Sequence, residues 1–363
     1  MILMAIDHVR LYGGIPAGGE SASLFFTRWI THFSAPGFAF FAGTSIFLMS
    51  RKMNDFASLS KFLLKRGLLL VLLEITFIRL LWAFKIDYSQ FFLAGVIWML
   101  GWCMVIMAFF VRFNAATLGI LGLCIMAGQS LFHYVPNVLP AHLGDSFSLF
   151  WNFIYPTDAQ SPDNIAILYV IVPWIGVMAA GYGFGLVIEM EENRRRNFCI
   201  SIGLSSTFIF VLAGSLIALT SDNPHNTPFL FRLLNQNKYP ASQLFLLMTL
   251  GPLILLVPFV EKAKGWLWNT LDLLGRSPMF YYLAHVILIH VSALVVNYLR
   301  SGQFHQDWYQ TAPFYTIQPE DVRWSLPMMY AVWLIDITIL YFACKWYFDF
   351  KVRHPAIKWL KYI

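Results

Sequence analysis

The sequence predicts an all-α membrane protein, a polytopic bundle of about ten transmembrane helices whose first helix is short or truncated. Two observations predict this fold class. Hydrophobic residues make up 58% of the chain and charged residues only 12%, whereas soluble domains carry about 25% charged residues. Apolar runs long enough to cross about 30 Å of hydrocarbon also follow one another with no polar linker between them. We therefore expect one integral membrane domain over residues 1–363.

Each apolar run of spanning length is expected to form one helix. The runs lie at 30–49, 66–84, 91–111, 115–134, 166–188, 198–219, 241–260, 278–298 and 326–348. A further stub opens the chain, because the apolar residues 1–6 are followed at once by Asp7 and His8. The stub is too short to span a bilayer. This favours a start upstream of Met1 over a partial first helix.

The distribution of lysine and arginine predicts the orientation in the membrane. Basic residues concentrate in alternate loops, after the runs that end at 49, 111, 188 and 260, and at the C-terminus, which includes Lys358 and Lys361. By contrast, residues 135–165 contain no lysine or arginine. The positive-inside rule then places the basic loops and the C-terminus in the cytoplasm. The loops 9–29, 135–165, 220–240 and 300–325 are expected outside.

The cysteines and the net charge also fit a membrane protein. The four cysteines lie in or beside apolar runs without a CxxC spacing, so we expect buried thiols and neither disulfides nor a metal site. The net charge of +6 comes from residues that act as topology signals, and a nucleic-acid partner is not expected.

Ionisable residues near the outer ends of the first two predicted helices are the strongest candidates for chemistry. Asp7 and His8 are adjacent, and a carboxylate beside an imidazole is the arrangement that a general base needs. Arg10 follows, while Arg28 and His32 are four residues apart and so share a helix face. The alternative interpretation is a set of interfacial anchors. The expected similar depth of these side chains favours a common site.

Other ionisable residues lie deeper in the predicted helices, where they are costly and usually have a partner. We expect Glu74 and Arg79 to form structural pairs, with Asp336 a candidate partner for Arg79. His285 and His290 share one predicted helix, and satisfied packing is the commoner role for such histidines. HExxH, GxSxG and P-loop motifs do not occur, so protease, serine hydrolase and nucleotide hydrolase classes lack support.

Small residues mark close contacts between the predicted helices. Gly176, Gly181, Gly183 and Gly185 share one helix, and Gly37 and Gly43 lie in another. Small residues let membrane helices approach closely. We expect these glycines to pack against neighbouring helices.

Several stretches resemble the bacterial branch of the heparan-α-glucosaminide N-acetyltransferase family. They are MAIDHVR at 4–10, FTRWITHFSAPGFAFFAGTS at 26–45, VIWMLGW at 96–102, VPWIGVM at 172–178, LNQNKYPASQLFLLMTLGP at 234–252 and FYYLAH at 280–285. The resemblance extends over nearly the whole chain. It implies a multi-pass protein of the bacterial inner membrane that transfers an acetyl group from cytoplasmic acetyl-CoA to an amine or hydroxyl of a sugar on the far side.

The resemblance also implies roles for individual residues. Asp7 occupies the place of a family asparagine, while the family histidine has no clear counterpart in the loop 13–19, so His8 or His32 is expected to act instead. Arg10, Arg28 and His285 are candidate substrate-binding residues. The candidates for the CoA phosphates are Lys65, Arg66 and Arg276, whose alternative role is topology signalling. The family's opening Asp-x-x-Arg-Gly segment is absent.

Two rival classes remain open from the sequence. A transporter or flippase of a sugar- or lipid-linked solute also uses buried charges and kinked helices, although no internal repeat supports it. A structural protein would use its polar residues only to hold the bundle together. The acceptor is unnamed, but Trp151, Tyr155, Trp308 and Tyr309 in the outer loops suit stacking on a sugar. The oligomeric state is open.

Overall fold

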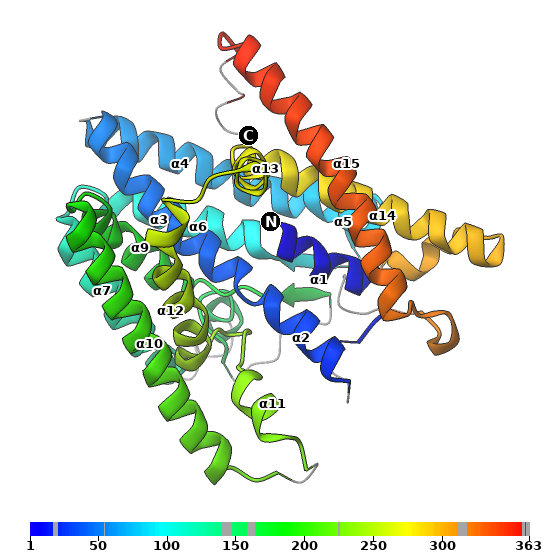
Figure 1. The fold of residues 1–363 in the computed structure, drawn as a ribbon, viewed down its shortest axis with the longest axis horizontal. Coiled ribbons are helices and arrows are strands. Elements are labelled where there is room, and N and C mark those ends of the chain that lie inside the picture. Colours follow the sequence, from blue (N-terminus) through cyan, green and yellow to red (C-terminus); the bar gives the residue numbers. More distant parts are fainter. Residues whose placement is uncertain are drawn as a thin grey trace. The chain divides into compact units, whose positions relative to one another are not determined.

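The computed structural model confirms the all-α prediction (Figure 1). The chain divides into two compact units. It describes all residues except 17–20, 54, 90, 139–146, 158–163, 224–225, 311–317, 358–359 and 361–363. Unit 1 comprises residues 1–34, 76–91 and 262–363, and unit 2 comprises residues 35–75 and 92–261. The single domain expected from the sequence stays a prediction.

Unit 1 is built from the two ends of the chain and one short internal segment. Its elements are α1 (Ile2–Tyr12), α2 (Ala22–Thr31), α5 (Arg79–Ala83), α13 (Trp266–Gly275), α14 (Pro278–Ser301), the 3-10 turns η3 (Gln306–Tyr309) and η4 (Glu320–Val322), and α15 (Leu326–Arg353). The helix α1 packs against α2, α14 and α15, and α14 also packs against α5 and α15. This unit therefore joins both ends of the chain around α1.

Unit 2 is built from the middle of the chain. Its elements are α3 (Ser34–Met53), α4 (Phe56–Leu73), β1 (Phe92–Ala94), α6 (Val96–Phe110), α7 (Ala115–Ala127), η2 (Gln129–Val138), β2 (Ile165–Ile167), α9 (Trp174–Ile188), α10 (Glu192–Thr220), α11 (Phe229–Leu234) and α12 (Gln243–Val260). The π-helical turn η1 (Glu74–Ile78) begins in unit 2 and ends in unit 1. The strands β1 and β2 pair in parallel. This pair is not predicted from the sequence, because each strand has only three residues inside apolar surroundings.

Glycines bring the helices of unit 2 into backbone contact, as predicted. A Cβ on Gly67 of α4 would lie 2.6 Å from the carbonyl oxygen of Gly101 on α6, and a Cβ on Gly43 of α3 would overlap the carbonyl oxygen of Met178 on α9. Gly176, Gly181 and Gly183 lie against the backbone of neighbouring helices in the same way, Gly185 lies against the Phe47 side chain, and Gly37 has only an ordinary contact with Leu253. The long helices α10 and α12 run side by side in the same unit (Figure 1).

The predicted ten spans are shown only in part. Among the described residues, five helical segments are long and apolar enough to cross a membrane, at Ala22–Met53, Glu192–Thr220, Gln243–Val260, Pro278–Ser301 and Leu326–Arg353. A sixth is the pair α7 and η2, which bends by 73°. The apolar helices α6 and α9 are shorter than this. Ten full spans are therefore not shown, and α1, with 11 residues, is short, as expected.

Two smaller predictions need correction. Cys103, Cys199 and Cys344 are buried free thiols as expected, but Cys124 is an exposed free thiol on α7. Only a few residues of α7 are buried, so a cysteine within an apolar run does not have to face the protein interior. In addition, Tyr309 is buried and bonded to Asn297 and Gln318. It is therefore a structural residue and not an exposed stacking surface.

Candidate functional site

The helix α1 positions the predicted general base in unit 1. Its apolar residues Met4, Ala5, Ile6 and Val9 are buried, because α1 packs against three other helices of the unit. His8 lies between these positions and is half-buried. Packing on both sides of the helix therefore holds the imidazole at a fixed place while part of its surface stays accessible.

His8 forms a hydrogen bond with a histidine from the far end of the chain. Its Nδ1 lies 2.7 Å from Nε2 of His285 on α14. The Nδ1 atom of His285 lies 3.0 Å from the carbonyl oxygen of Tyr281, one turn earlier on α14. A carbonyl only accepts, so Nδ1 of His285 carries the proton and its Nε2 accepts from Nδ1–H of His8. In this neutral arrangement Nε2 of His8 carries the lone pair.

Aromatic side chains surround the histidine pair. The edge of the Trp82 ring packs against His8 with 4.7 Å between ring centroids, and His8 stacks on His285 at 4.8 Å. Tyr281 and Tyr282 pack against His285, which has no exposed surface. The buried histidine thus lies behind the half-buried one and fixes its orientation.

Asp7 and Arg10 form an ion pair on the same helix. Nε and Nη2 of Arg10 donate to Oδ1 of Asp7 at 3.1 and 3.0 Å, and Nη1 donates to the carbonyl oxygen of Ile15 at 2.7 Å. Arg10 is 5% exposed. The sequence predicts that Arg10 binds the substrate. In the structure its guanidinium is hydrogen-bonded to Asp7 and to the turn that follows α1.

The other predicted residues of the outer cluster lie on the neighbouring helix α2. Arg28 is half-buried in its last turn, and His32 is a buried residue at its C-terminal end, where α2 gives way to α3. Arg28 and His32 therefore lie on or at the end of a helix that packs against α1, the helix that carries His8. Their roles remain predictions. Residues 17–19 of the predicted loop 13–19 lie outside the described residues.

A second histidine on α14 has a structural environment. His290 is buried, and its ring nitrogens lie 3.1 Å from the carbonyl oxygen of Leu81 and from Oε1 of Gln306. Its ring stacks on Phe84 at 3.8 Å. These contacts tie α14 to the end of α5, which matches the satisfied packing expected for this residue.

The deep charged residues have other partners than those predicted. Arg79 donates to the carbonyl oxygens of Lys85, Asp87 and Phe91 and contacts the rings of Tyr88 and Phe91. The predicted pairing of Arg79 with Asp336 is therefore wrong. Carbonyl groups of the loop after α5 converge on the guanidinium and satisfy it without a carboxylate.

Asp336 and Glu74 each meet a partner of another kind. Oδ1 of Asp336 accepts a hydrogen bond from the hydroxyl of Ser292 on α14 at 2.7 Å. The carboxyl of Glu74 faces the backbone at the N-terminus of α6, next to Gly95, and neither of its oxygens has a hydrogen bond of normal geometry among the described residues. Neither partner could be found from the spacing of charges along the sequence.

The residues predicted to bind CoA phosphates differ in accessibility. Lys65 is exposed on α4, and Arg276 pairs with Asp272 at 2.6 Å on the surface. Arg66 is half-buried beside the Phe62 ring, and its Nε has no hydrogen-bond partner among the described residues. An unsatisfied guanidinium nitrogen fits a phosphate or carboxylate ligand. Arg66 and Lys65 belong to unit 2, and Arg276 belongs to unit 1.

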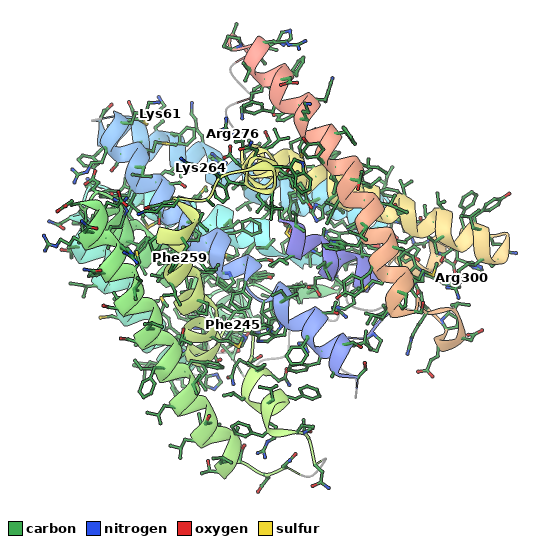
Figure 2. The ribbon with its side chains drawn as sticks, in the orientation of Figure 1. Lys61, Phe245, Phe259, Lys264, Arg276 and Arg300 are labelled. Atoms are coloured by element: carbon green, nitrogen blue, oxygen red, sulfur yellow. The ribbon has the colours of Figure 1, made fainter. Side chains whose placement is uncertain are left out.

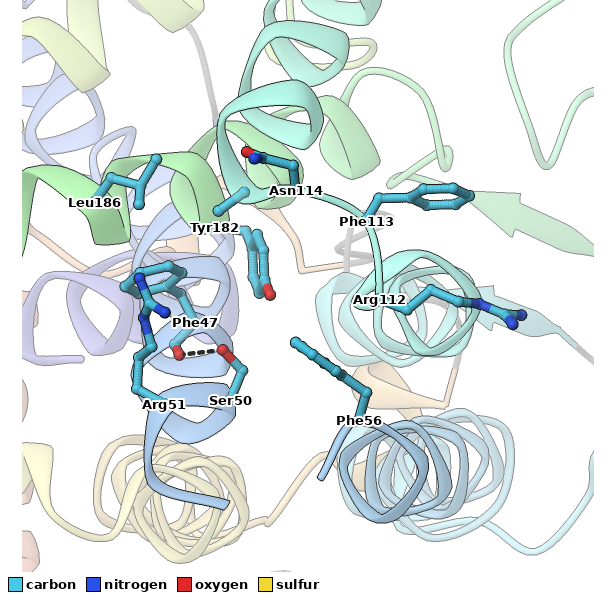
Figure 3. Close-up of a pocket in the computed structure, with 10 residues that line it drawn as sticks. Phe47, Ser50, Arg51, Phe56, Arg112, Phe113, Asn114, Tyr182 and Leu186 are labelled. Atoms are coloured by element: carbon cyan, nitrogen blue, oxygen red, sulfur yellow. Dashed lines mark hydrogen bonds between the residues drawn. The ribbon is translucent and has the colours of Figure 1, made fainter. Parts of the chain in front are cut away.

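A pocket of about 380 Å³ lies in unit 2 at the end of α3 (Figure 3). Phe56 extends into it from the start of α4, facing Tyr182 of α9, and Arg51 lies along its edge over the Phe47 ring (Figure 3). Arg51 also pairs with Glu189 at 3.0 Å, and both side chains are exposed. Such surface pairs contribute little to stability, so Arg51 is available to an anionic ligand.

The fold and this arrangement define a membrane-embedded helical protein with a hydrogen-bonded histidine pair that can act as a base. A comparison with known families narrows the class. Residues 1–234 match the catalytic region of heparan-alpha-glucosaminide N-acetyltransferase, which is more than half of the chain, so the chain belongs to this family of membrane acetyltransferases. No curated protein matches the chain. The family uses acetyl-CoA as the donor.

Several residues of the site were not found by the sequence analysis. Trp82 lies on α5, far from His8 in the chain, and no motif marks it. Tyr281 could have been found, because it precedes His285 by one helical turn in an apolar helix. Both His285 and Tyr281 lie beyond the segment that matches the family.

Proposed function

We propose that the chain moves an acetyl group from cytoplasmic acetyl-CoA to an amine or hydroxyl of a sugar on the outer side of the bacterial inner membrane. The observation that carries this proposal is the hydrogen bond between His8 and His285. It leaves the lone pair on Nε2 of a half-buried imidazole, in the state that a general base requires. Family membership supports the donor and the reaction type.

Each residue of the site has its own role in the proposed transfer. Nε2 of His8 accepts the proton of the acceptor, whose nitrogen or oxygen attacks the thioester carbon. The C–S bond breaks, and the proton passes from His8 to the leaving sulfur. His285 is a positioning residue that fixes the tautomer of His8, and Asp7 balances positive charge while Arg10 holds it in place. His32 remains the second candidate for the base.

A covalent route uses the same histidine as the nucleophile. In that route Nε2 of His8 attacks the thioester and the acetyl group rests on the imidazole before the acceptor takes it. Incubation with labelled acetyl-CoA and no acceptor separates the routes. Acetylated protein that is lost in a His8→Ala variant indicates the covalent route, and its absence with normal turnover indicates direct transfer.

The donor's phosphates need cationic partners on the side of the basic loops. Arg66 is the best supported of the sequence candidates because of its unsatisfied Nε. Arg51, at the edge of the pocket, is a further candidate. Lys65, Arg276 and Arg28 stay candidates for phosphate or substrate contacts. Variants Arg66→Ala and Arg51→Ala are expected to raise KM for acetyl-CoA more than they lower kcat.

The central test compares histidine variants in a turnover assay. We expect His8→Ala to lower acetyl-CoA turnover by about 10² to 10⁴-fold, the usual contribution of a general base. The matched control is His354→Ala, because His354 is exposed and bonds only to the carbonyl of Phe350 on its own helix. Full activity in both His8→Ala and His32→Ala would contradict the proposal. Solute uptake into vesicles without CoA binding would instead indicate a transporter or flippase.

A further inference from the structure

The indole ring of Trp82 lies directly beside the proposed base. Its ring centroid is 4.7 Å from that of His8, with the two ring planes inclined by 68°, and it stacks on the Tyr12 ring with 5.7 Å between centroids. His8 and Tyr12 are four residues apart on α1 and so share one face of that helix. Trp82, which is buried, therefore covers part of the face that carries the base.

Side chains from three other elements hold the backbone that carries Trp82. The carbonyl oxygen of Trp82 accepts a hydrogen bond from the Tyr12 hydroxyl of α1 at 2.7 Å. The carbonyl oxygen of the preceding residue lies 3.1 Å from Nδ1 of His290 on α14, and that of the following residue accepts from Nε2 of Gln306 in η3 at 2.9 Å. The last carbonyl groups of a helix have no partner within the helix, so these three contacts fix the end of α5.

The residues that hold Trp82 also contact one another. The Tyr12 hydroxyl lies 3.2 Å from Nδ1 of His290, and Nε2 of His290 lies 3.1 Å from Oε1 of Gln306. His290 is in the interior of α14, well before Arg300 in the last turn (Figure 2), and helices fray only at their ends. A side chain that discriminates between ligands has to be locked in position by its neighbours. Trp82 meets this requirement.

Any acyl group that is transferred with the help of His8 has to come close to this ring. A general base lies within about 2.6–3.2 Å of the atom from which it takes a proton, and that atom attacks the acyl carbon from about 3–3.5 Å. The acyl carbon therefore lies within about 7 Å of Nε2 of His8, and the Trp82 ring lies inside that distance. In the covalent route the acyl carbon is bonded to Nε2 and is closer still.

We propose that Trp82 restricts the transferred group to acetyl by occupying the space that a longer acyl chain would need. This inference rests on the proposed function, because it concerns the acyl group of the same transfer. The chemistry does not depend on chain length: the C–S bond of the thioester breaks, the acyl carbon bonds to the acceptor nitrogen or oxygen, and the acceptor proton passes to the leaving sulfur. Trp82 is thus a specificity-determining residue that takes no part in bond formation.

A purely structural role for Trp82 leads to a different expectation. Removing a buried tryptophan leaves a cavity and lowers stability wherever the residue lies, so turnover of all acyl donors would fall alike. A residue that limits chain length changes the ratio between donors instead. That ratio is formed within one protein preparation, so a smaller folded fraction does not alter it.

The experiment measures kcat/KM for acetyl-CoA, propionyl-CoA and butyryl-CoA, as release of free CoA thiol with glucosamine or glucose as the acceptor. Because each methylene in such a pocket changes kcat/KM by about 10- to 200-fold, the unmutated protein should prefer acetyl-CoA to butyryl-CoA by about 100-fold or more. In Trp82→Ala the ratio of butyryl-CoA to acetyl-CoA should rise by at least about tenfold. Trp82→Leu, which leaves a smaller cavity, should change the ratio in the same direction by a smaller factor.

The matched control removes another tryptophan that is equally buried. Trp98 on α6 in unit 2 is 5% exposed, as is Trp82, and it packs against the rings of Trp102 and Phe153. Trp98→Ala should leave the ratio between the donors unchanged. An unchanged ratio in Trp82→Ala, an equal rise in Trp98→Ala, or an unmutated protein without preference for acetyl-CoA would each overturn the proposal. If Trp82→Ala does not fold, Trp82→Leu decides.

Failure of the proposed function gives a separate result. If the unmutated protein transfers an acyl group to neither sugar, the proposed function fails with these acceptors. The affinities for acetyl-CoA and butyryl-CoA, measured by thermal stabilisation of the purified protein, then replace kcat/KM. A ratio of affinities that shifts toward butyryl-CoA in Trp82→Ala supports the role of Trp82, and an unchanged ratio overturns it.

Discussion

Helices pack by different means in the two units. In unit 2, α4 meets α6 through Gly67 and Gly101, backbone against backbone. In unit 1, α1 meets α14 through the rings of His8 and His285 and a hydrogen bond between them. Glycine contacts give close packing but offer no titratable group. Contacts through imidazoles cost desolvation and yet supply a group that accepts and donates protons.

This difference in helix packing explains why the candidate base lies in unit 1 and not among the glycine contacts of unit 2. Backbone packing without side chains leaves no space for a substitution and nothing to exchange with a ligand. A half-buried histidine held by a buried partner is both fixed and reactive. Disturbing the glycine contacts of unit 2 should therefore affect folding, and disturbing the histidine pair of unit 1 should affect activity.

The largest effect is expected from a branched side chain at a backbone contact in unit 2. A Cβ at Gly43 would overlap the carbonyl oxygen of Met178, which is backbone and cannot rotate away. Gly43→Val should therefore cost more than the usual 1–3 kcal/mol of overpacking and yield no folded protein in detergent. Gly275→Ala is the control, because nothing lies within 4 Å of its added Cβ. Similar thermal stability of the Gly43→Val and Gly275→Ala variants would show that the backbone contact at Gly43 is not needed for folding of unit 2.

The next effect concerns activity without loss of fold. His285→Phe keeps an aromatic ring behind His8 but removes the acceptor of the 2.7 Å hydrogen bond. The tautomer of His8 is then no longer fixed. We expect kcat to fall by about 10- to 100-fold, near the lower end of what a general base contributes, with KM for acetyl-CoA unchanged. The measurement is a Michaelis–Menten comparison with the unmutated protein, and an effect on KM alone would contradict a positioning role.

Much of the fold could be predicted because membranes impose simple rules. Apolar length and the lack of charge identified Gln243–Val260 and Pro278–Ser301. The same rules did not predict the 73° bend between α7 and η2, because apolar length carries no information on a change of direction within a run. Residue types also predicted His8 as a candidate base. They could not predict its partner, since His285 lies 277 residues further along the chain and only folding brings the two together.

A smaller effect tests how a charge is accommodated in unit 2. Gly95 leaves space for the carboxyl of Glu74 at the start of α6, and a Cβ there would overlap Oε1. Gly95→Ala should destabilise the protein by about 1–2 kcal/mol through displacement of that carboxyl. In Glu74→Ala the obstacle is removed, so the same glycine substitution should then cost little. A double-mutant cycle of unfolding free energies measures the coupling, and additive effects would show that the two residues do not interact.

The smallest effect depends on pH and concerns a helix cap that lies outside the spans. Asp55 caps α4, where its carboxylate accepts from the N–H groups of Ser58 and Ala57. The hydroxyl of Ser58 first, and then the N–H groups of Ala57 and Ser58, lower the pKa of the exposed Asp55 carboxyl below its ordinary value by hydrogen bonding to it. Because the folded-state pKa is the lower one, the cap stabilises α4 fully above the ordinary pKa of about 4. The stabilisation is lost as the pH falls through the folded value. Asp55→Asn retains an N-cap without a titratable charge, so its melting temperature should lose less on acidification than that of the unmutated protein. Parallel acid profiles of the two proteins would show that the carboxylate contributes nothing to the start of α4.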